Sequence, residues 1–232
     1  MNRVVSAARL HTVGGQSISV PWSVLASALA VNFLIFGTIQ AGDGIDEDPT
    51  TGGLLALYIA TAVVFIQAMN KPLSFALGFG LTRRTYLFGT GLFALAISFG
   101  SAVVLYALYG LERASGGWWM SLSFFGALGL GEGNPVVAVL GYAAPMMALA
   151  ALGALAGGIH ARWGLVGVYT SVIVALIAGG AFCVVMFSAH AWTPLGRWIA
   201  DQPSSALFAG YPWIVTAVAG AGAYAVVRRV AA

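Results

Sequence analysis

Six long apolar stretches that contain no charged residue place this chain in a membrane. A helix needs about 20 apolar residues to cross the hydrocarbon core of a bilayer. Stretches near that length, free of Asp, Glu, Lys, Arg and His, are Val20–Gln40, Gly53–Met69, Tyr86–Tyr109, Val136–Ile159, Leu165–Phe187 and Leu207–Val227. We therefore expect an all-α integral membrane protein, with six transmembrane helices in residues 20–227, a lead-in over residues 1–19 and a tail over residues 228–232.

The composition excludes an ordinary soluble domain. Hydrophobic residues make up 60% of the chain and charged residues 7%, whereas about 25% of a soluble domain is charged. A soluble fold must also present a charged, solvated exterior. The pI of about 9.2 does not indicate nucleic-acid binding, because the basic residues are scattered at the edges of the apolar stretches, where they set membrane orientation.

The distribution of Lys and Arg predicts which ends of the spans are cytoplasmic, since these residues are enriched in short cytoplasmic loops. With the N-terminus inside, the inner segments hold Arg3, Arg9, Lys71, Arg83, Arg84, Arg162, Arg228 and Arg229. The outer loops then hold Arg113 and Arg197, together with all the acids: Asp43, Asp46, Glu47, Asp48, Glu112, Glu132 and Asp201. We expect a multi-pass membrane protein with both termini in the cytoplasm.

The N-terminal segment has two interpretations. Leu10, Val13 and Ile18, together with Arg3 and Arg9, suggest a short amphipathic lead-in on the inner membrane surface, and a frayed tail is the alternative. A signal peptide is not expected, because the apolar stretch that follows exceeds the h-region of about 7–15 residues.

Several kinds of chemistry have no motif in this sequence. The only lysine, Lys71, lies in Asn70-Lys71-Pro72 and not in a G-x-x-x-x-G-K-[ST] loop, so no ATP hydrolysis through a P-loop is expected in this chain. The histidines His11, His160 and His190 are expected at the surface of loops and do not have the spacing of a metal site. No catalytic constellation, metal site or cofactor is predicted, and the chain is not expected to be an enzyme.

The spans lack the ionisable residues that ion-coupled carriers hold within the membrane. Their neutral polar side chains, such as Asn32, Thr61 and Thr216, are expected to form hydrogen bonds between helices. If the chain transports a compound, the energy should therefore come from another subunit.

The predicted inner loop over residues 70–85 is too apolar to be a plain solvated connector. Its large apolar residues alternate with small ones, and their period does not decide between a helix and an extended stretch. Three interpretations are open: the loop lies among the lipid headgroups, it caps the helical bundle, or it docks a cytoplasmic partner.

The first 110 residues resemble a known family of transport proteins. The order Arg9-Leu10-His11, Val20-Pro21-Trp22 and Asn32, followed by the run Leu73–Gly89 with its Arg-Arg pair, is similar to the small six-span permeases of type-2 ABC exporters, common in actinobacteria. The resemblance implies a place in the bacterial plasma (inner) membrane. It also implies that two permeases face each other over two P-loop ATPase subunits, which bind the ATP and Mg²⁺.

In that family, the inner loop between spans two and three is a coupling helix that sits in a groove of the ATPase. The resemblance implies that the docking residues are among Phe75, Leu77, Phe79, Arg83 and Arg84. It also implies that the transport path is bordered by spans one, two and five, which makes Asn32, Phe36, Phe65 and Gln67 the expected lining residues.

The function expected from the sequence is the permease subunit of an exporter for a hydrophobic or amphipathic compound. Its partners would be a cytoplasmic ATPase, a second permease copy or homologue, and membrane lipid. A non-transporting membrane anchor or sensor component is the alternative, followed by an ion-coupled carrier. The aromatic outer loops Leu111–Pro135 and Ser188–Pro212 are expected to form an interfacial belt, or short helices that close the outer mouth.

Overall fold

The computed structural model describes residues 3–12, 15–41, 50–126, 129–130 and 133–229. The helices are α1 (Arg3–Arg9), α2 (Gln16–Ala41), α3 (Leu54–Ala68), α4 (Lys71–Gly78), α5 (Arg83–Ala114), α6 (Pro135–Ser188), α7 (Trp192–Ala200) and α8 (Pro212–Val227). Short helical turns are η1 (Leu10–Thr12), η2 (Gly117–Ser121) and η4 (Ala206–Gly210). The described residues contain no strand beyond an isolated bridge between Thr50 and Ser123. The prediction of an all-α protein is confirmed.

Among the described residues, five helical stretches, against the six spans predicted, are long and apolar enough to cross a membrane. They are Gln16–Gln40, Leu54–Gly78, Arg83–Ala114, Pro135–Ser188 and Ala206–Val227. The fourth stretch is 54 residues long and contains both the fourth and the fifth predicted spans. Such helices are those of a membrane protein, as the sequence predicts.

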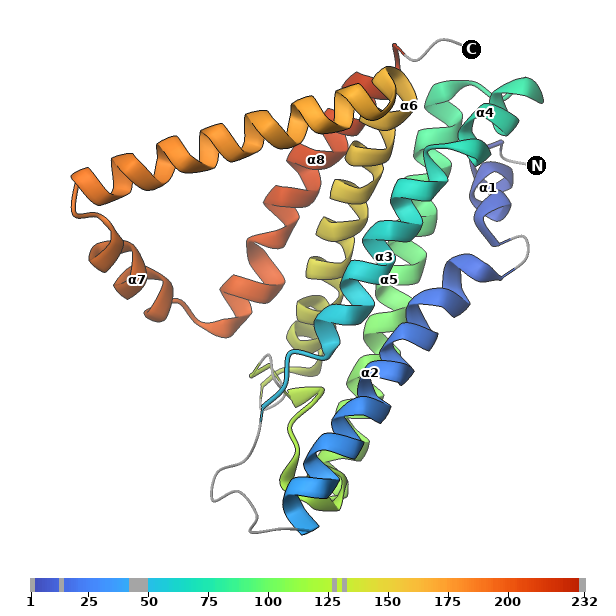
Figure 1. Ribbon diagram of the computed structural model, residues 1–232. Coiled ribbons are helices and arrows are strands. Elements are labelled where there is room, and N and C mark those ends of the chain that lie inside the picture. The colour runs from blue at the N-terminus through green and yellow to red at the C-terminus, as the bar shows by residue number, and fades with distance from the viewer. Residues whose placement is uncertain (1–2, 13–14, 42–49, 127–128, 131–132, 230–232) are drawn as a thin grey trace.

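Gly164 divides α6 into two arms. Its φ of 63° and ψ of −156° lie in a region that only glycine adopts readily. The arm before Gly164 packs within the bundle, whereas the arm after it runs away from the bundle (Figure 1, orange). None of residues 165–188 is buried, and α7 and η4 then lead the chain back to α8. The fifth predicted span is thus a helix, but its apolar surface is left uncovered by this chain.

Small residues let the helices of the bundle approach closely. A Cβ at Gly153 or Gly157 of α6 would collide with the backbone carbonyl oxygens of Ala62 and Ile66 in α3. The core beside this contact holds aromatic side chains from α3, α5 and α6. Within it the Tyr58 hydroxyl donates to the Tyr142 carbonyl over 3.3 Å.

The neutral polar side chains of the spans mostly bond within their own helix, contrary to the predicted bonds between helices. The Asn32 amide donates to the Ala28 carbonyl over 2.8 Å, and the Thr61 hydroxyl donates to the Leu57 carbonyl over 2.8 Å. Thr216 does the same with the Pro212 carbonyl. A short side chain on a helix reaches the carbonyl four residues earlier with little rearrangement, so these side chains bond locally and not to a neighbouring helix.

The N-terminal lead-in is part of the bundle, so the frayed tail is wrong for its described residues. Helix α1 lies against the start of α5, and Ala7 is fully buried there. A Cβ at Gly89 would lie 2.6 Å from the Ala7 Cβ, so glycine is needed for this close approach. Val13 lies outside the described residues.

The two ends of the bundle differ in what they carry. Helices α1 and α4 and the C-terminal end of α8 lie at one end, and the C-terminal end of α2 lies at the other (Figure 1). We call the end that holds α1, α4 and the C-terminal end of α8 the basic end. It includes Arg9, Arg83, Arg84 and Arg228. The predicted placement of the first and last segments on one side is thus compatible with the fold.

Candidate functional site

The predicted docking loop is a short helix with a defined beginning and end. Pro72 lies in the first turn of α4, where its missing N–H and fixed φ suit a helix start. Gly80, with φ of 76°, ends the helix: its N–H donates to the Leu77 carbonyl, and the Leu81 N–H donates to the Ala76 carbonyl. This pair of bonds is the Schellman arrangement, so the segment has a fixed shape.

Helix α4 buries one face and exposes two phenylalanines on the other. Leu73 and Ala76 are buried against the bundle, whereas the side chains of Phe75 and Phe79 are 60% and 76% exposed. The two rings lie one turn apart with centroids separated by 4.6 Å. A pair of this kind on a rigid helix is the feature of the basic end best suited to contact another protein.

The other three predicted docking residues do not share that surface. Leu77 and Arg83 are half-buried, and the Arg84 guanidinium lies 6.0 Å from the centroid of the Tyr224 ring. Together with Arg228 they line a cavity of about 430 Å³ between the start of α5 and the end of α8. The structure therefore separates the five residues into an exposed aromatic pair and a basic cavity.

The four predicted pathway residues do not come together within one chain. Phe65 is buried and packs 5.9 Å from Phe93, centroid to centroid, whereas Gln67 is exposed and lines a cavity of about 620 Å³ beside His11. Asn32 and Phe36 are half-buried on α2.

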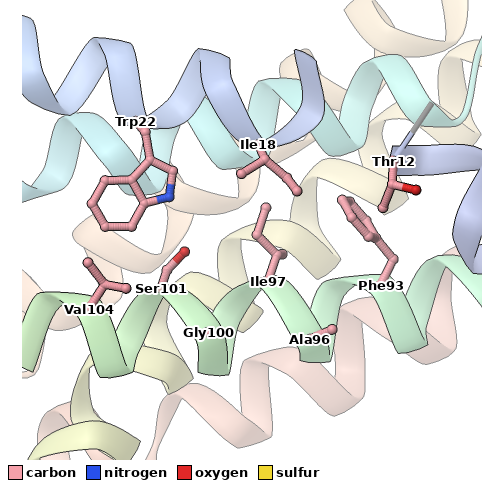
Figure 2. Close-up of a pocket in the computed structure, with 9 residues that line it drawn as sticks. All are labelled: Thr12, Ile18, Trp22, Phe93, Ala96, Ile97, Gly100, Ser101 and Val104. Carbon is pink, nitrogen blue, oxygen red and sulfur yellow. The ribbon is translucent and has the colours of Figure 1, made fainter. Parts of the chain in front are cut away.

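A mainly apolar cavity of about 400 Å³ lies between α2 and α5. Figure 2 shows Ile18 and Trp22 on one side and Ile97 and Val104 on the other. The lining also includes Ser101 and no charged residue. The cavity suits an apolar group such as a hydrocarbon chain.

His11 is buried, which corrects the prediction of a surface histidine. Its Nε2 lies within hydrogen-bond distance of the Thr90 Oγ1, at 2.9 Å, and the Thr90 Oγ1 also lies 3.0 Å from the Tyr86 carbonyl oxygen. The ring stacks on Phe93 with centroids 5.2 Å apart. Burial lowers the pKa of His11 to about 4. His160 likewise lies within α6 and not in a loop, and His190 is exposed as expected.

Glu112, which the sequence places in an outer loop, is a buried carboxylate. It lies in the last turn of α5 and is 4% exposed. Its Oε2 accepts from the Trp118 indole and from the backbone N–H groups of Phe124 and Phe125, at 3.0, 3.0 and 2.8 Å. Its Oε1 accepts from the Gly126 N–H at 2.9 Å.

These four bonds fold the segment after α5 around one anionic group, at the end of the bundle opposite α4. Because N–H donors satisfy both oxygens, Glu112 is a structural anchor for this segment. The sequence signal for this role is weak, since the donors are mostly backbone groups.

No group of three His, Cys, Asp or Glu residues that could hold a metal ion comes together in the part of the chain that is described. The acids Asp43, Asp46, Glu47, Asp48 and Glu132 lie outside that part. No family model, curated protein or solved structure matches this chain.

Proposed function

We propose that this chain is the permease subunit of an ATP-driven exporter of the type-2 ABC class. It crosses the membrane six times with both termini in the cytoplasm, pairs with a second permease copy, and moves a hydrophobic or amphipathic compound. A separate P-loop ATPase docks at the basic end and binds the ATP and Mg²⁺. The observation that carries the proposal is the exposed aromatic pair of α4, presented by a rigid helix at that end.

The aromatic pair supports docking because exposed aromatic side chains are costly to leave in water and are common at the centres of protein interfaces. Phe75 and Phe79 project from a helix whose opposite face is fixed to the bundle by Leu73 and Ala76. A helix held in this way can transmit a push from a partner to α3 and α5, which flank it in the chain.

The absence of charge from the predicted spans supports an external energy source. Carriers driven by ions keep ionisable groups within the membrane to bind or relay the ion, and the six apolar stretches have none. Glu112 lies beyond the third stretch and is occupied by four N–H donors. This arrangement disfavours the ion-coupled carrier.

The apolar cavities and the uncovered face of α2 support a path for an apolar or amphipathic compound between two copies. Val31, Leu34 and Ile35 of α2 are 52%, 71% and 48% exposed. A second copy would cover this face and bring its own α2 close to the first.

A membrane anchor or sensor component is the second candidate, because the same aromatic pair would suit its partner. The two functions differ in one respect: only the permease makes ATP hydrolysis by its partner respond to a transported compound. Hydrolysis that is stimulated by an amphipathic compound in reconstituted membranes would favour the permease, and hydrolysis that is indifferent to every such compound would favour the anchor.

The docking site is tested by isolating the tagged chain after mild crosslinking and identifying P-loop ATPases by mass spectrometry. The Phe79→Asp variant should reduce ATPase recovery by about tenfold or more, since it removes an interface aromatic and adds a charge. The matched control is Trp119→Asp, which changes an exposed aromatic (84% exposed) at the other end of the bundle. Equal ATPase recovery with both variants, or no ATPase with the unaltered chain, would refute docking through α4.

A further inference from the structure

Three arginines line one cavity at the basic end. Arg83, Arg84 and Arg228 surround a space of about 430 Å³, and none of the other lining residues is acidic. The Arg83 Nε is buried and has no hydrogen-bond partner among the described residues. Arginine stays charged at every physiological pH, so this cavity concentrates positive charge that nothing in its lining neutralises.

A second cavity lies next to the first, within the bundle. It has a volume of about 500 Å³ and lies among α3, α5, α6 and α8. Arg84 and Tyr224 line both cavities, so these two side chains form the border that the cavities share. Deeper in, the walls are almost wholly apolar and include Phe65, Leu87 and Met147. The combined space is an apolar slot with a basic mouth.

The chemistry of this space defines the molecule that fits it. Guanidinium groups pair with phosphate through parallel N–H···O bonds, and an apolar slot of this kind accepts a hydrocarbon chain without leaving a polar group unpaired. A molecule with both parts is an amphiphile with an anionic phosphate head. The cytoplasmic leaflet supplies such molecules as anionic phospholipids, which basic residues at the membrane surface attract.

We propose that this space is a binding site for one anionic phospholipid, whose phosphate lies among Arg83, Arg84 and Arg228 and whose acyl chain lies in the slot between α5 and α8. The site goes beyond the transport activity proposed above. It requires only that the basic end lies at a membrane surface, so loss of ATPase docking would leave it intact.

The site also separates two roles at the basic end. Arg84 turns toward Tyr224 and the cavity, whereas Phe75 and Phe79 project from α4. A bound lipid would neutralise the arginines and brace α8 against α5, beside the helix proposed to receive the ATPase.

Native mass spectrometry of the full chain in detergent tests the proposal with dioleoylphosphatidylglycerol and, for comparison, dioleoylphosphatidylcholine. We expect one phosphatidylglycerol molecule to bind at least about tenfold more tightly than phosphatidylcholine. Inorganic phosphate, compared with chloride at the same ionic strength, should not displace the bound lipid, because the acyl chain of the lipid also contributes to binding. Equal affinity for the two lipids, or displacement by inorganic phosphate, would overturn the proposal.

A double variant and its control test whether phosphatidylglycerol binds at these arginines. The double variant Arg84→Gln with Arg228→Gln should reduce phosphatidylglycerol affinity to the phosphatidylcholine level. Its control, Arg9→Gln, removes an exposed charge at the same end and should change the affinity less than about twofold. If the double variant keeps the affinity of the unaltered chain, the arginines do not hold the headgroup.

The slot is tested by Gly91→Leu. A Cβ at Gly91 meets no atom within 4 Å, and Gly91 lines the slot, so leucine should occupy the space of the acyl chain and lower phosphatidylglycerol affinity about tenfold. The control is Gly180→Leu on the exposed arm of α6, where a Cβ also meets no atom within 4 Å. Melting temperatures of all variants show whether each is folded. If a folded Gly91→Leu variant keeps its affinity for phosphatidylglycerol, the acyl chain of the lipid does not lie in this slot and the proposed site is refuted.

Discussion

Glu112→Gln removes the charge that organises the segment after α5 while keeping the size of the side chain. The amide retains one acceptor oxygen and replaces the other with a donor. If the oxygen keeps the Oε2 position with its three donors, the new NH₂ group faces the Gly126 N–H, which loses its acceptor.

The expected cost follows from these bonds. A buried donor left without an acceptor costs about 1–3 kcal/mol, and each of the three remaining bonds weakens by about 1 kcal/mol when its acceptor is no longer charged. Relief of the cost of burying the carboxylate offsets part of this loss. The net destabilisation should be roughly 2–4 kcal/mol, which lowers the melting temperature by about 4–16 °C at the slope typical of chains this long.

Two measurements check this prediction. Thermal unfolding in detergent gives the change in melting temperature, and hydrogen–deuterium exchange should be faster in peptides covering residues 118–126. Asp201→Asn is the matched control, because Asp201 is an exposed acid and its substitution should leave both unchanged. If Glu112→Gln melts like the unaltered chain and exchanges no faster, the carboxylate does not hold this segment.

Three further substitutions or conditions test other parts of the fold. Because the pKa of His11 is about 4 in the folded chain and about 6.5 unfolded, the unfolded state binds the proton first as the pH falls. The contribution of His11 to the free energy of unfolding should therefore be nearly constant above pH 6.5 and fall by up to roughly 3 kcal/mol toward pH 4. Denaturant titrations of the His11→Phe variant should lack this loss of stability. Gly164→Ala should cost about 1–3 kcal/mol, since its φ of 63° disfavours a side chain, whereas Gly179→Ala in the same helix should not destabilise. Gly153→Leu should lower the melting temperature, at a cost of about 1–3 kcal/mol or more, because its side chain meets the Ala62 carbonyl; an unchanged melting temperature would mean that α3 and α6 are not in close contact there.

The helices were predictable because a membrane-spanning helix must be long and apolar, and both properties are local in sequence. The six predicted stretches all lie in helices. The apolar pattern of residues 70–85 alone does not distinguish the helix α4 from an extended stretch. Pro72 and Gly80 are start and stop signals of a helix that are visible in the sequence. Combining these signals with the apolar pattern would have favoured a helix over an extended loop.

The tertiary partners were not predictable because they depend on segments far apart in the chain. His11 bonds to Thr90, 79 residues away, and its three aromatic and polar neighbours come from α5. The burial of Glu112 is not predictable either, because three of its four donors are backbone N–H groups that no sequence pattern identifies. The direction of the arm after Gly164 depends on a backbone conformation that glycine permits, but the presence of a glycine in the sequence does not show that this conformation is adopted.

The docking of an ATPase on α4 is tested most directly by photo-crosslinking in cells of the source organism. A photoreactive phenylalanine analogue in place of Phe79, which is 76% exposed, should form an adduct with a P-loop ATPase, and the same analogue in place of Trp119 should not. An ATPase adduct at Phe79 alone is the expected result. Adducts only with lipid at Phe79, or an ATPase adduct at Trp119 in its place, would contradict the proposed function.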